Sequence, residues 1–408
     1  MLNETSVLGP RLSLENGIKD KYMKGLRINS IYLLLLCLIS TGTAFSKNRN
    51  GGVPVDTSAT SETKALYSNL KDIQETHILV GHHDATLYGH TWAGDENRSD
   101  IKDVCGSHPA LIGFDFALIT NKPSAMTVNR SELLLKRMIE TYNRGGVISM
   151  CWHTDNPLTG ETAWVDTTKA IVNTVKELLP GGKAHEAYTD KLKMIAGMAQ
   201  KAKGVDGKLV PVIFRPFHEM EGGWFWWGRP YRTNGEFKSL WRFTVEYLRD
   251  TLGVHNFLYA FSTDCKFKTR EDYLIDYPGD NYVDVLGMDE YWDFRPDGAN
   301  NPLLAAEKVK VVSDLAQEKD KIAAMTETGL ESITDSTFFT KTLMPVLRYK
   351  GSKLAYIMLW RNDNHMKHHF YAPFPGHNSV SDFMKFYNDE YTLFESDLKG
   401  IYHKKKNI

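Results

Sequence analysis

The chain has 408 residues with 42% apolar and 24% charged residues, which is usual for a folded globular protein. Its formal net charge of −1 argues against binding to nucleic acid or to a membrane surface, because both require an excess of basic residues. Its nine tryptophans are more than core packing ordinarily needs, and they favour a carbohydrate-binding cleft.

The first 46 residues are predicted to be an N-terminal extension followed by a secretory signal. Lys24 and Arg27 precede an apolar run at residues 31–39, and the small residues 42–44 follow it. This is the charged, apolar and small-residue layout of an export signal. The apolar run is too short to span a bilayer as a helix, so no membrane span is expected.

The signal sets expectations for the start and fate of the chain. Residues 1–22 lack the signal pattern, which favours Met23 as the start of translation, with cleavage after Ala44 or Ser46. We therefore expect export to the periplasm, the cell surface or the medium. A lipid anchor on Cys37 is the less favoured alternative, because Leu36 before it is large for a lipidation motif.

The three cysteines beyond the signal, Cys105, Cys151 and Cys265, lie far apart. An odd number at such spacing is no disulfide framework, although one pair could form. No Cys-x-x-Cys motif or His/Cys cluster indicates zinc, and we expect neither a metal nor a cofactor.

A polar linker at residues 47–63 is predicted to lead into a single domain at residues 64–408. There, eight short, nearly continuous apolar runs alternate with amphipathic segments such as 131–144, 170–179, 236–250 and 303–319. Such runs are typical of parallel strands buried on both faces, and eight of them favour a (β/α)8 (TIM) barrel of the α/β class. No glycine-rich phosphate loop follows any of these runs, which argues against a nucleotide-binding sheet. The predicted strands are at 77–84, around 111, 146–153, 209–219, 256–264, 283–292, 321–329 and 356–363.

Titratable and aromatic residues gather where these strands end. In a barrel, the carboxyl ends of the strands face one mouth, where catalytic groups collect. Six such ends therefore predict one site. They are His82-His83-Asp84, Trp152-His153, His218-Glu219, Asp289-Glu290-Tyr291-Trp292, Glu327 and Trp360-Arg361-Asn362-Asp363.

Two of these residues, Glu219 and Glu327, each end an apolar strand directly. Glycoside hydrolysis uses two carboxyl groups, one that protonates the leaving oxygen and one that attacks the sugar or activates water. The aromatic residues of RPFHEMEGGWFWWG, residues 215–228, would raise the pKa of Glu219 and keep it protonated. A single such glutamate is more often a capping or ion-pairing residue, but the pair together favours catalysis.

The stretch 215–228 resembles the acid/base motif of glycoside hydrolase family 26, chiefly β-mannanases, in a clan of retaining barrels. A His precedes the acid/base in this family, as His218 precedes Glu219 here. MTETG, residues 325–329, is similar to the family's nucleophile strand and implies that Glu327 is the nucleophile. The segments 78–92 and 99–116 also resemble the family, so that the match spans roughly residues 60–400. Glu221 departs from the Asn or small polar residue common there, which leaves its contact open.

The resemblance also implies roles around the sugar at the scissile bond. Tyr291 would hydrogen-bond the nucleophile, His153 and His218 would line the subsite, and Trp360 would form its platform. The alternatives are a locally satisfied buried tyrosine for Tyr291 and a core histidine for His153. His218 is the best sequence indication of mannose, whose 2-hydroxyl is axial.

Further aromatic residues are expected on the leaving-group side. Trp224 and Phe225 would build it, although Phe225, Trp226 and Trp227 could equally be loop core. Arg361 would bind a more distant hydroxyl or form a structural ion pair. Trp164 is a weaker candidate for another subsite.

These expectations amount to a monomeric, endo-acting β-1,4-mannanase that cleaves mannan, galactomannan or glucomannan through a covalent intermediate. Within the family, an exo-acting enzyme that releases mannobiose and a mixed-linkage β-glucanase remain alternatives. A non-catalytic glycan-binding protein is the alternative of another class, but it would not need the set of Glu219, Glu327, Tyr291 and His218.

Overall fold

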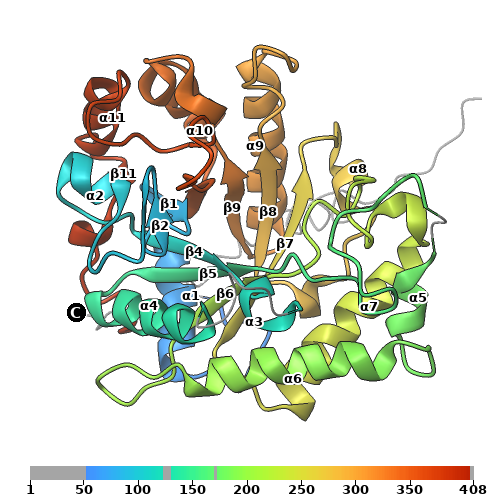
Figure 1. Ribbon diagram of the computed structural model, residues 1–408. Coiled ribbons are helices and arrows are strands. Elements are labelled where there is room, and N and C mark those ends of the chain that lie inside the picture. Colours follow the sequence, from blue (N-terminus) through green and yellow to red (C-terminus); the bar gives the residue numbers. More distant parts are fainter. Residues whose placement is uncertain (1–51, 123–129, 170–171, 405–408) are drawn as a thin grey trace, which may run out of the picture. The chain divides into compact units, whose positions relative to one another are not determined.

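The computed structural model describes residues 52–122, 130–169 and 172–404 (Figure 1). The predicted extension and signal at 1–46 lie outside this part of the chain. Among the described residues, no helix combines the length and apolar character needed to cross a membrane. Cys105, Cys151 and Cys265 are free thiols.

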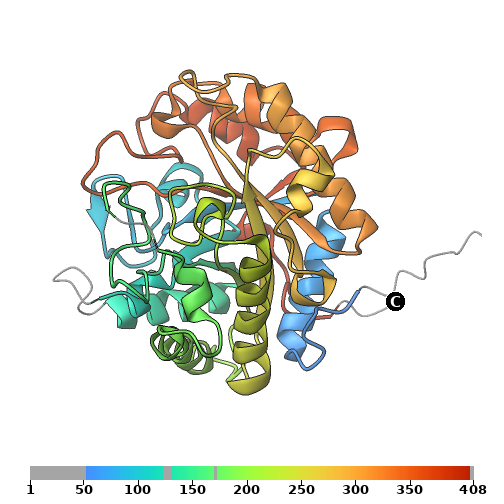
Figure 2. The same ribbon diagram turned by 90° about the vertical axis from the view of Figure 1, so that its right-hand side faces the viewer.

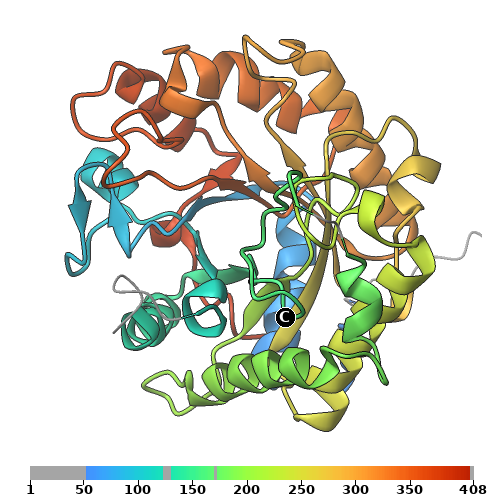
Figure 3. The same cartoon turned by 45° about the vertical axis from the view of Figure 1, so that its right-hand side comes forward.

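Eight parallel strands form a closed barrel, which confirms the predicted fold class (Figure 3). Each strand pairs with the next one along the chain, and the last, β10, pairs with β1 to close the ring. A short strand, β11 (Thr392–Leu393), also pairs with β1 at Ile78 and Leu79. The barrel strands are β1 (Ile78–His83), β4 (Leu111–Asp115), β5 (Val147–Cys151), β6 (Val212–Arg215), β7 (Phe257–Asp264), β8 (Val285–Glu290), β9 (Ile322–Thr328) and β10 (Tyr356–Leu359).

The strands are short and apolar because both of their faces are covered. Every residue of β5, β8 and β9 is buried, between the barrel interior and the outer helices. Such strands read in sequence as continuous apolar runs, which is why their positions were predictable. All eight predicted strands are present, and most are shorter than the predicted segments.

Helices lie outside the strands, and α7 runs along the outer face of the barrel (Figures 1 and 2). The predicted helices at 131–144, 236–250 and 303–319 are confirmed as α4, α7 and α9. Of the segment 170–179, only a short helix, α5, is described, and the long helix before β6 is α6. The helices are α1 (Ser61–Ile73), α2 (Asp100–Cys105), α3 (Ala117–Thr120), α4 (Arg130–Arg144), α5 (Thr174–Leu178), α6 (His185–Lys201), α7 (Asn234–Glu246), α8 (Arg270–Leu274), α9 (Pro302–Glu318), α10 (Met344–Leu347) and α11 (Val380–Tyr387).

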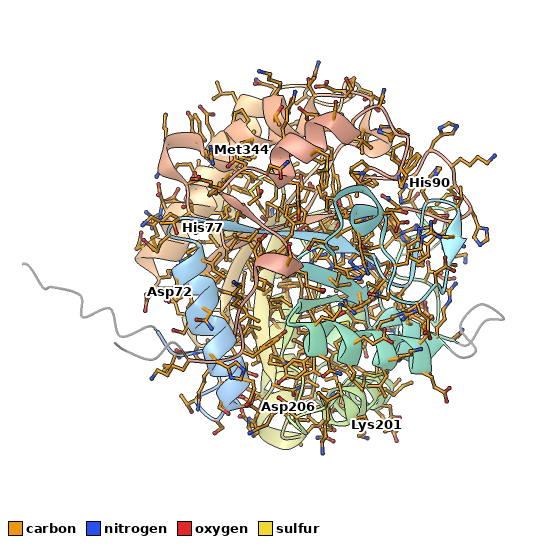
Figure 4. All side chains as sticks on the ribbon, turned by 90° about the vertical axis from the view of Figure 1, so that its left-hand side faces the viewer. Asp72, His77, His90, Lys201, Asp206 and Met344 are labelled. Carbon is orange, nitrogen blue, oxygen red and sulfur yellow. The ribbon has the colours of Figure 1, made fainter. Side chains whose placement is uncertain are left out.

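The barrel has two distinct ends. Figure 4 shows His77, which precedes β1, at one side of the view and His90, which follows β1 in the hairpin of β2 (Tyr88–Gly89) and β3 (Trp92–Ala93), at the other. Because all eight strands are parallel, their carboxyl ends lie on the side of His90, and the side chains predicted to form the site lie there.

The segment before residue 64 packs on the barrel, so packing begins ahead of the predicted domain boundary. The Val55 amide donates to Asp284 Oδ1 at 2.8 Å, and the Thr60 amide donates to the His255 carbonyl at 2.8 Å. The Thr60 side chain accepts from the Thr63 amide and caps α1. The polar residues of this segment therefore make contacts with the barrel, and the segment is more than a free linker.

One irregularity falls beside the site. Met288 pairs with Met325, but the next residue, Asp289, pairs with Glu327, so that Thr326 is an extra residue in β9. This β-bulge changes which side chains of β9 face the barrel interior. The Thr326 hydroxyl lies 2.7 Å from Asp289 Oδ1 and 2.8 Å from Ser262 Oγ, which fixes the bulge.

Candidate active site

The backbone after β6 is held in an unusual conformation that positions Glu219. Phe217 and Glu219 have positive φ angles of 51° and 53°, which non-glycine residues seldom adopt. The Glu219 amide donates to the Ser262 carbonyl on β7 at 3.0 Å, and the Trp227 indole donates to the His218 carbonyl at 2.8 Å. The Phe217 ring is fully buried and packs against Trp227. Part of the aromatic surface therefore holds this backbone in place.

Glu219 is prepared to act as a proton donor. Burial raises the pKa of its carboxyl well above the ordinary value, and the negative charges of Asp289 and Glu327 raise it further. The Trp224 indole donates to Glu219 Oε2 at 2.7 Å, which lowers the pKa by a smaller amount. The net shift favours the protonated carboxyl, which is the form that general-acid catalysis requires.

Glu327 is held by donors at both of its oxygens. Arg215, at the end of β6, donates to Glu327 Oε1 and, at 2.7 Å, to Asp289 Oδ2. The Tyr291 hydroxyl donates to Glu327 Oε2 at 3.1 Å, so the structure contains the hydrogen bond expected from the resemblance. These contacts aim the carboxylate and leave it little freedom to rotate.

The two glutamates lie close together. Carboxylate oxygens of Glu219, Asp289 and Glu327 lie within 4.8 Å of one another. Each residue contributes one oxygen to this group, and a nearest approach below 4.8 Å is compatible with the about 5–5.5 Å between the carboxyl groups of retaining glycosidases.

A pair of histidines lines the cleft beside Glu327. His218 Nε2 lies 3.1 Å from His153 Nε2, and His153 Nδ1 lies 2.7 Å from Asp115 Oδ2. Burial lowers the pKa of His153, but the charge of Asp115, its hydrogen bond and the charge of Glu327 together leave that pKa raised. Burial and the charge of Arg215 hold the pKa of His218 well below its ordinary value. His153 therefore donates, and His218 accepts as the neutral ring.

The rings after β10 and β1 form another wall. Trp360 stacks on His83, with ring centroids 4.4 Å apart and an interplanar angle of 19°. Arg361 forms an ion pair with Asp363 and also lines the cleft, so both readings of this residue have support. His83 was noted in the sequence only as part of a strand end, and its support of Trp360 was not predicted.

The aromatic loop after Glu219 divides into core and cleft residues. Trp226 and Trp227 are core, at 3% and 0% exposed, whereas Phe225 lines the cleft although it is 2% exposed and stacks on Trp227. Trp224 lies behind Glu219 and is linked to the cleft only by its hydrogen bond to that carboxyl. Trp164 is 59% exposed, and its ring centroid lies 4.8 Å from that of Phe225.

A cleft of about 790 Å³ contains these groups, within the roughly 300–1,000 Å³ typical of ligand sites. Of the nine sequence-predicted site residues, Trp224 alone does not line it. The eight that do are His153, His218, Glu219, Phe225, Tyr291, Glu327, Trp360 and Arg361.

Two groups of described side chains are spaced closely enough to hold a metal ion: Asp115, Cys151 and His153, and Glu219, Asp289 and Glu327. In the second group, the Arg215 guanidinium already bonds Asp289 and Glu327 and supplies a positive charge between them. Sequence reasoning missed this role of Arg215, although an arginine closing an apolar strand two residues before Phe217 is a visible signal.

Glu221, the position that departs from the family pattern, is a half-buried residue. Burial raises the pKa of its carboxyl to about 8, and Asp264 contributes. Its Oε2 atom is buried and has no hydrogen-bond partner in the described part of the chain. The residue at this position is therefore a carboxyl whose neutral, protonated form is favoured by burial, and one of its oxygens has no partner among the described residues.

The profile of Glycosyl hydrolase family 26 matches residues 55–396. The chain belongs to this family. The family 26 protein GH26C from Muricauda sp. MAR_2010_75 has a structure with a TM-score of 0.81 at 38% identity, covering 87% of this chain and 96% of that one. A family 26 β-mannanase from Bacteroides ovatus gives 0.79 at 39% identity, covering 86% and 99%.

A curated relative carries a functional name. A mannan endo-1,4-beta-mannosidase from Bifidobacterium adolescentis is 35% identical over 361 residues, or 84% of this chain. The alignment spans only 35% of that relative, and only 52% of a second mannan endo-1,4-beta-mannosidase, from Thermothelomyces thermophilus. This family 26 protein thus spans about a third to a half of the length of these curated relatives.

Replacing Trp224 with Phe is expected to shift the alkaline limb of the activity profile to higher pH. The indole hydrogen bond lowers the pKa of Glu219, and its loss raises that pKa and keeps the acid protonated over a wider range. The pH dependence of kcat/KM would measure this. Trp226→Phe is the matched control, because Trp226 donates to the Thr154 carbonyl and not to Glu219. An alkaline limb that stays in place or moves to lower pH would contradict the assignment.

Proposed function

We propose that the protein is an endo-acting β-1,4-mannanase that retains the configuration of the bond it cleaves. The spacing of Glu219 and Glu327, whose carboxylate oxygens lie within 4.8 Å, carries this proposal. The names of the family 26 relatives support mannan as the substrate.

The reaction proceeds by double displacement. Glu327 attacks the anomeric carbon and forms a glycosyl ester, while Glu219 gives its proton to the departing glycosidic oxygen. Glu219, now a carboxylate, takes a proton from a water molecule, whose oxygen attacks the same carbon and releases Glu327. Arg215 and Tyr291 stabilise the Glu327 carboxylate before attack and when it departs.

The walls of the cleft suit a mannosyl unit next to these carboxyl groups. Trp360 offers a flat apolar face, supported by His83, on which a sugar ring can stack. His153, held by Asp115, and His218 present polar edges beside Glu327 for the hydroxyls of the same sugar. The leaving-group sugar would meet Trp224, whose ring Lys266 covers at 4.2 Å.

Product analysis over time tests the function. The chain from about Lys47 would be incubated with linear β-1,4-mannan, galactomannan and mixed-linkage β-glucan. Early mixed manno-oligosaccharides are expected. Mannobiose as the sole product from the first time point would indicate an exo-acting enzyme, and cleavage of glucan alone would overturn mannan as substrate. Binding of these polysaccharides without cleavage of any of them would refute the enzymatic function.

Replacing Tyr291 with Phe is expected to lower kcat by roughly 10- to 100-fold, because a hydrogen bond to a charged group contributes about 1.5–3 kcal/mol. The loss should fall on kcat more than on KM, since the Tyr291 hydroxyl contacts Glu327. Tyr371→Phe is the matched control, because its ring packs against Tyr291 without a hydrogen bond to Glu327. Equal effects of the two changes on kcat would contradict the role of Tyr291.

We also propose that the protein is exported, on the basis of Lys24, Arg27 and the apolar run at 31–39. Mass determination of the protein secreted by its host should give an N-terminus at or after Phe45. An intact N-terminus at Met1 or Met23 would refute cleavage.

A further inference from the structure

A thiol, an imidazole and a carboxylate meet at the carboxyl ends of neighbouring strands. One ligand atom from each of Cys151, His153 and Asp115 lies within 4.8 Å of the other two. Cys151 Sγ lies 3.6 Å from His153 Nδ1, and Asp115 Oδ2 lies 2.7 Å from the same nitrogen. Such a mixture of sulfur, nitrogen and oxygen donors is typical of zinc sites.

The pairing of the strands brings these donors together. Asp115 on β4 pairs with Cys151 on β5, and paired residues of neighbouring strands direct their side chains to the same face of the sheet. His83 on β1 pairs with Gly113, two residues before Asp115, and so shares that face. A Cβ atom on Gly113 would collide with the His83 ring, so the glycine makes room for it. Because the donors come from separate strands, no local motif in the sequence shows the set.

The distances suit a tetrahedral zinc ion. Bonds of about 2.3 Å to sulfur and about 2.0–2.1 Å to nitrogen place these two atoms about 3.6 Å apart at the tetrahedral angle. This is the separation of Cys151 Sγ and His153 Nδ1. A tetrahedral ion also requires Asp115 Oδ2 to move only roughly 0.6 Å further from His153 Nδ1.

Binding of the ion releases two protons and transfers no electrons. The Cys151 thiol loses its proton to water; burial raises the pKa of this thiol well above its ordinary value, but a coordinating thiol is deprotonated outright. The proton between His153 Nδ1 and Asp115 also leaves to water, while His153 Nε2 still donates to His218. A thiolate is a soft ligand, which favours zinc and cadmium over magnesium and calcium.

The surroundings of the thiol favour a cation. His83 Nε2 lies 3.9 Å from Cys151 Sγ, and burial holds the pKa of His83 well below its ordinary value, so its ring is neutral. Asp84 Oδ1 lies 3.7 Å from His83 Nε2 and has no hydrogen-bond partner among the described residues, although the Asp84 side chain is only 9% exposed. Asp115 and His153 line the cleft, from which an ion reaches the thiol.

We propose that Asp115, Cys151 and His153 form a binding site for a soft divalent cation of the zinc class, whose occupation inhibits the enzyme. His153 contacts His218, and His218 Nε2 lies 4.0 Å from Glu327 Oε1, so the ion lies beside the sugar that reacts. That sugar gains positive charge in an oxocarbenium-like transition state, which a neighbouring dication opposes. The inhibition rests on the proposed mannanase function, whereas the binding of the ion does not.

Cadmium tests the site directly, because its bond to a thiolate gives an ultraviolet charge-transfer band that imidazole and carboxylate ligands do not give. One equivalent of Cd²⁺ is expected to produce this band in the native protein. Cys151→Ala should abolish it, as should Cys151→Ser, which keeps the size of the side chain. Cys105→Ala is the matched control, because Cys105 is a free thiol that does not line the cleft, and this variant should keep the band.

Zinc tests the inhibition. The concentration of Zn²⁺ that halves the hydrolysis of mannan is expected to rise by about 10–100-fold in the Cys151 variants, since even the loss of a group behind a metal ligand costs this much affinity. The activity of each variant without metal is its own reference. A chelator should restore the native protein, and Mg²⁺ at the same concentration should not inhibit it.

The two readouts separate the claims. Absence of the band in the native protein, or its persistence in both Cys151 variants, would overturn the site. Loss of the band in these variants with a native protein insensitive to Zn²⁺ would overturn the inhibition. A native protein that does not cleave mannan before metal is added would overturn the mannanase function, and the band would still decide on the site. Loss of both band and inhibition with Cys151, but not with Cys105, would support the proposal.

Discussion

Replacement of Glu327 by alanine is expected to lower kcat on mannan by about 10⁴-fold or more, because the covalent step loses its nucleophile. The fold should persist, since Glu327 faces the cleft and a smaller side chain relieves the crowding of negative charge around Asp289. Azide supplied in solution can then attack the sugar in a single displacement. The product expected from dinitrophenyl β-mannobioside is the α-glycosyl azide.

The companion change, Glu219→Ala, should give the opposite stereochemistry. A dinitrophenolate leaving group needs no proton, so Glu327 still attacks, but water lacks its general base and the covalent intermediate accumulates. Azide needs no base, and the expected product is the β-glycosyl azide. Nuclear magnetic resonance of the two azides distinguishes the roles, and α-azide from Glu219→Ala with β-azide from Glu327→Ala would reverse the assignment.

Arg215→Met is expected to reduce both stability and activity. Arg215 and Asp289 are 2% and 0% exposed, and removal of one partner from a buried ion pair costs about 3–5 kcal/mol. Burial raises the pKa of Asp289 to about 7 even with the arginine present, and the loss of Arg215 raises it further. A group with a raised folded-state pKa destabilises the fold as pH rises. The loss in unfolding free energy should thus be smaller at about pH 6 than at about pH 9.

The double variant Arg215→Met, Asp289→Asn separates the two effects. An amide at residue 289 carries no charge, so part of the stability is expected to return. Activity should not return, because Glu327 Oε1 still lacks its donor. Urea unfolding and kcat measured on the same preparations test this, and recovery of kcat together with stability would refute a role for Arg215 in aiming Glu327.

The sequence predicted the strands and much of the site for one physical reason. A strand covered on both faces appears in the sequence as a nearly continuous apolar run, so polar residues at or just beyond its carboxyl end mark the barrel mouth, as Glu219 and Glu327 do. The resemblance then separated the roles of the two glutamates, which the pattern alone could not do.

Other features depend on contacts between distant segments. Arg215 is visible in the sequence as an arginine that closes an apolar strand, but its partner Glu327 lies 112 residues further along the chain, so no local pattern could identify the pair. The packing of Val55 against Asp284 joins residues 229 apart, and its polar neighbours look like a linker. Phe217 and Glu219 adopt positive φ angles that their residue types do not favour, and only the surrounding rings and β7 impose them.

The extra residue in β9 makes the orientation of Glu327 depend on chain length as well as on residue identity. A substitution at Thr326 keeps the residue count, so Glu327 would still project into the cleft even if the hydroxyl contacts were lost. Deletion of Thr326 would leave Glu327 paired with Asp289 on the same face of the sheet, but it would straighten β9 and shift the Glu327 carboxylate relative to Glu219 and Tyr291. We therefore expect this family 26 protein to tolerate substitutions at residue 326. A change in the number of residues between Met325 and Glu327 is not expected to be tolerated.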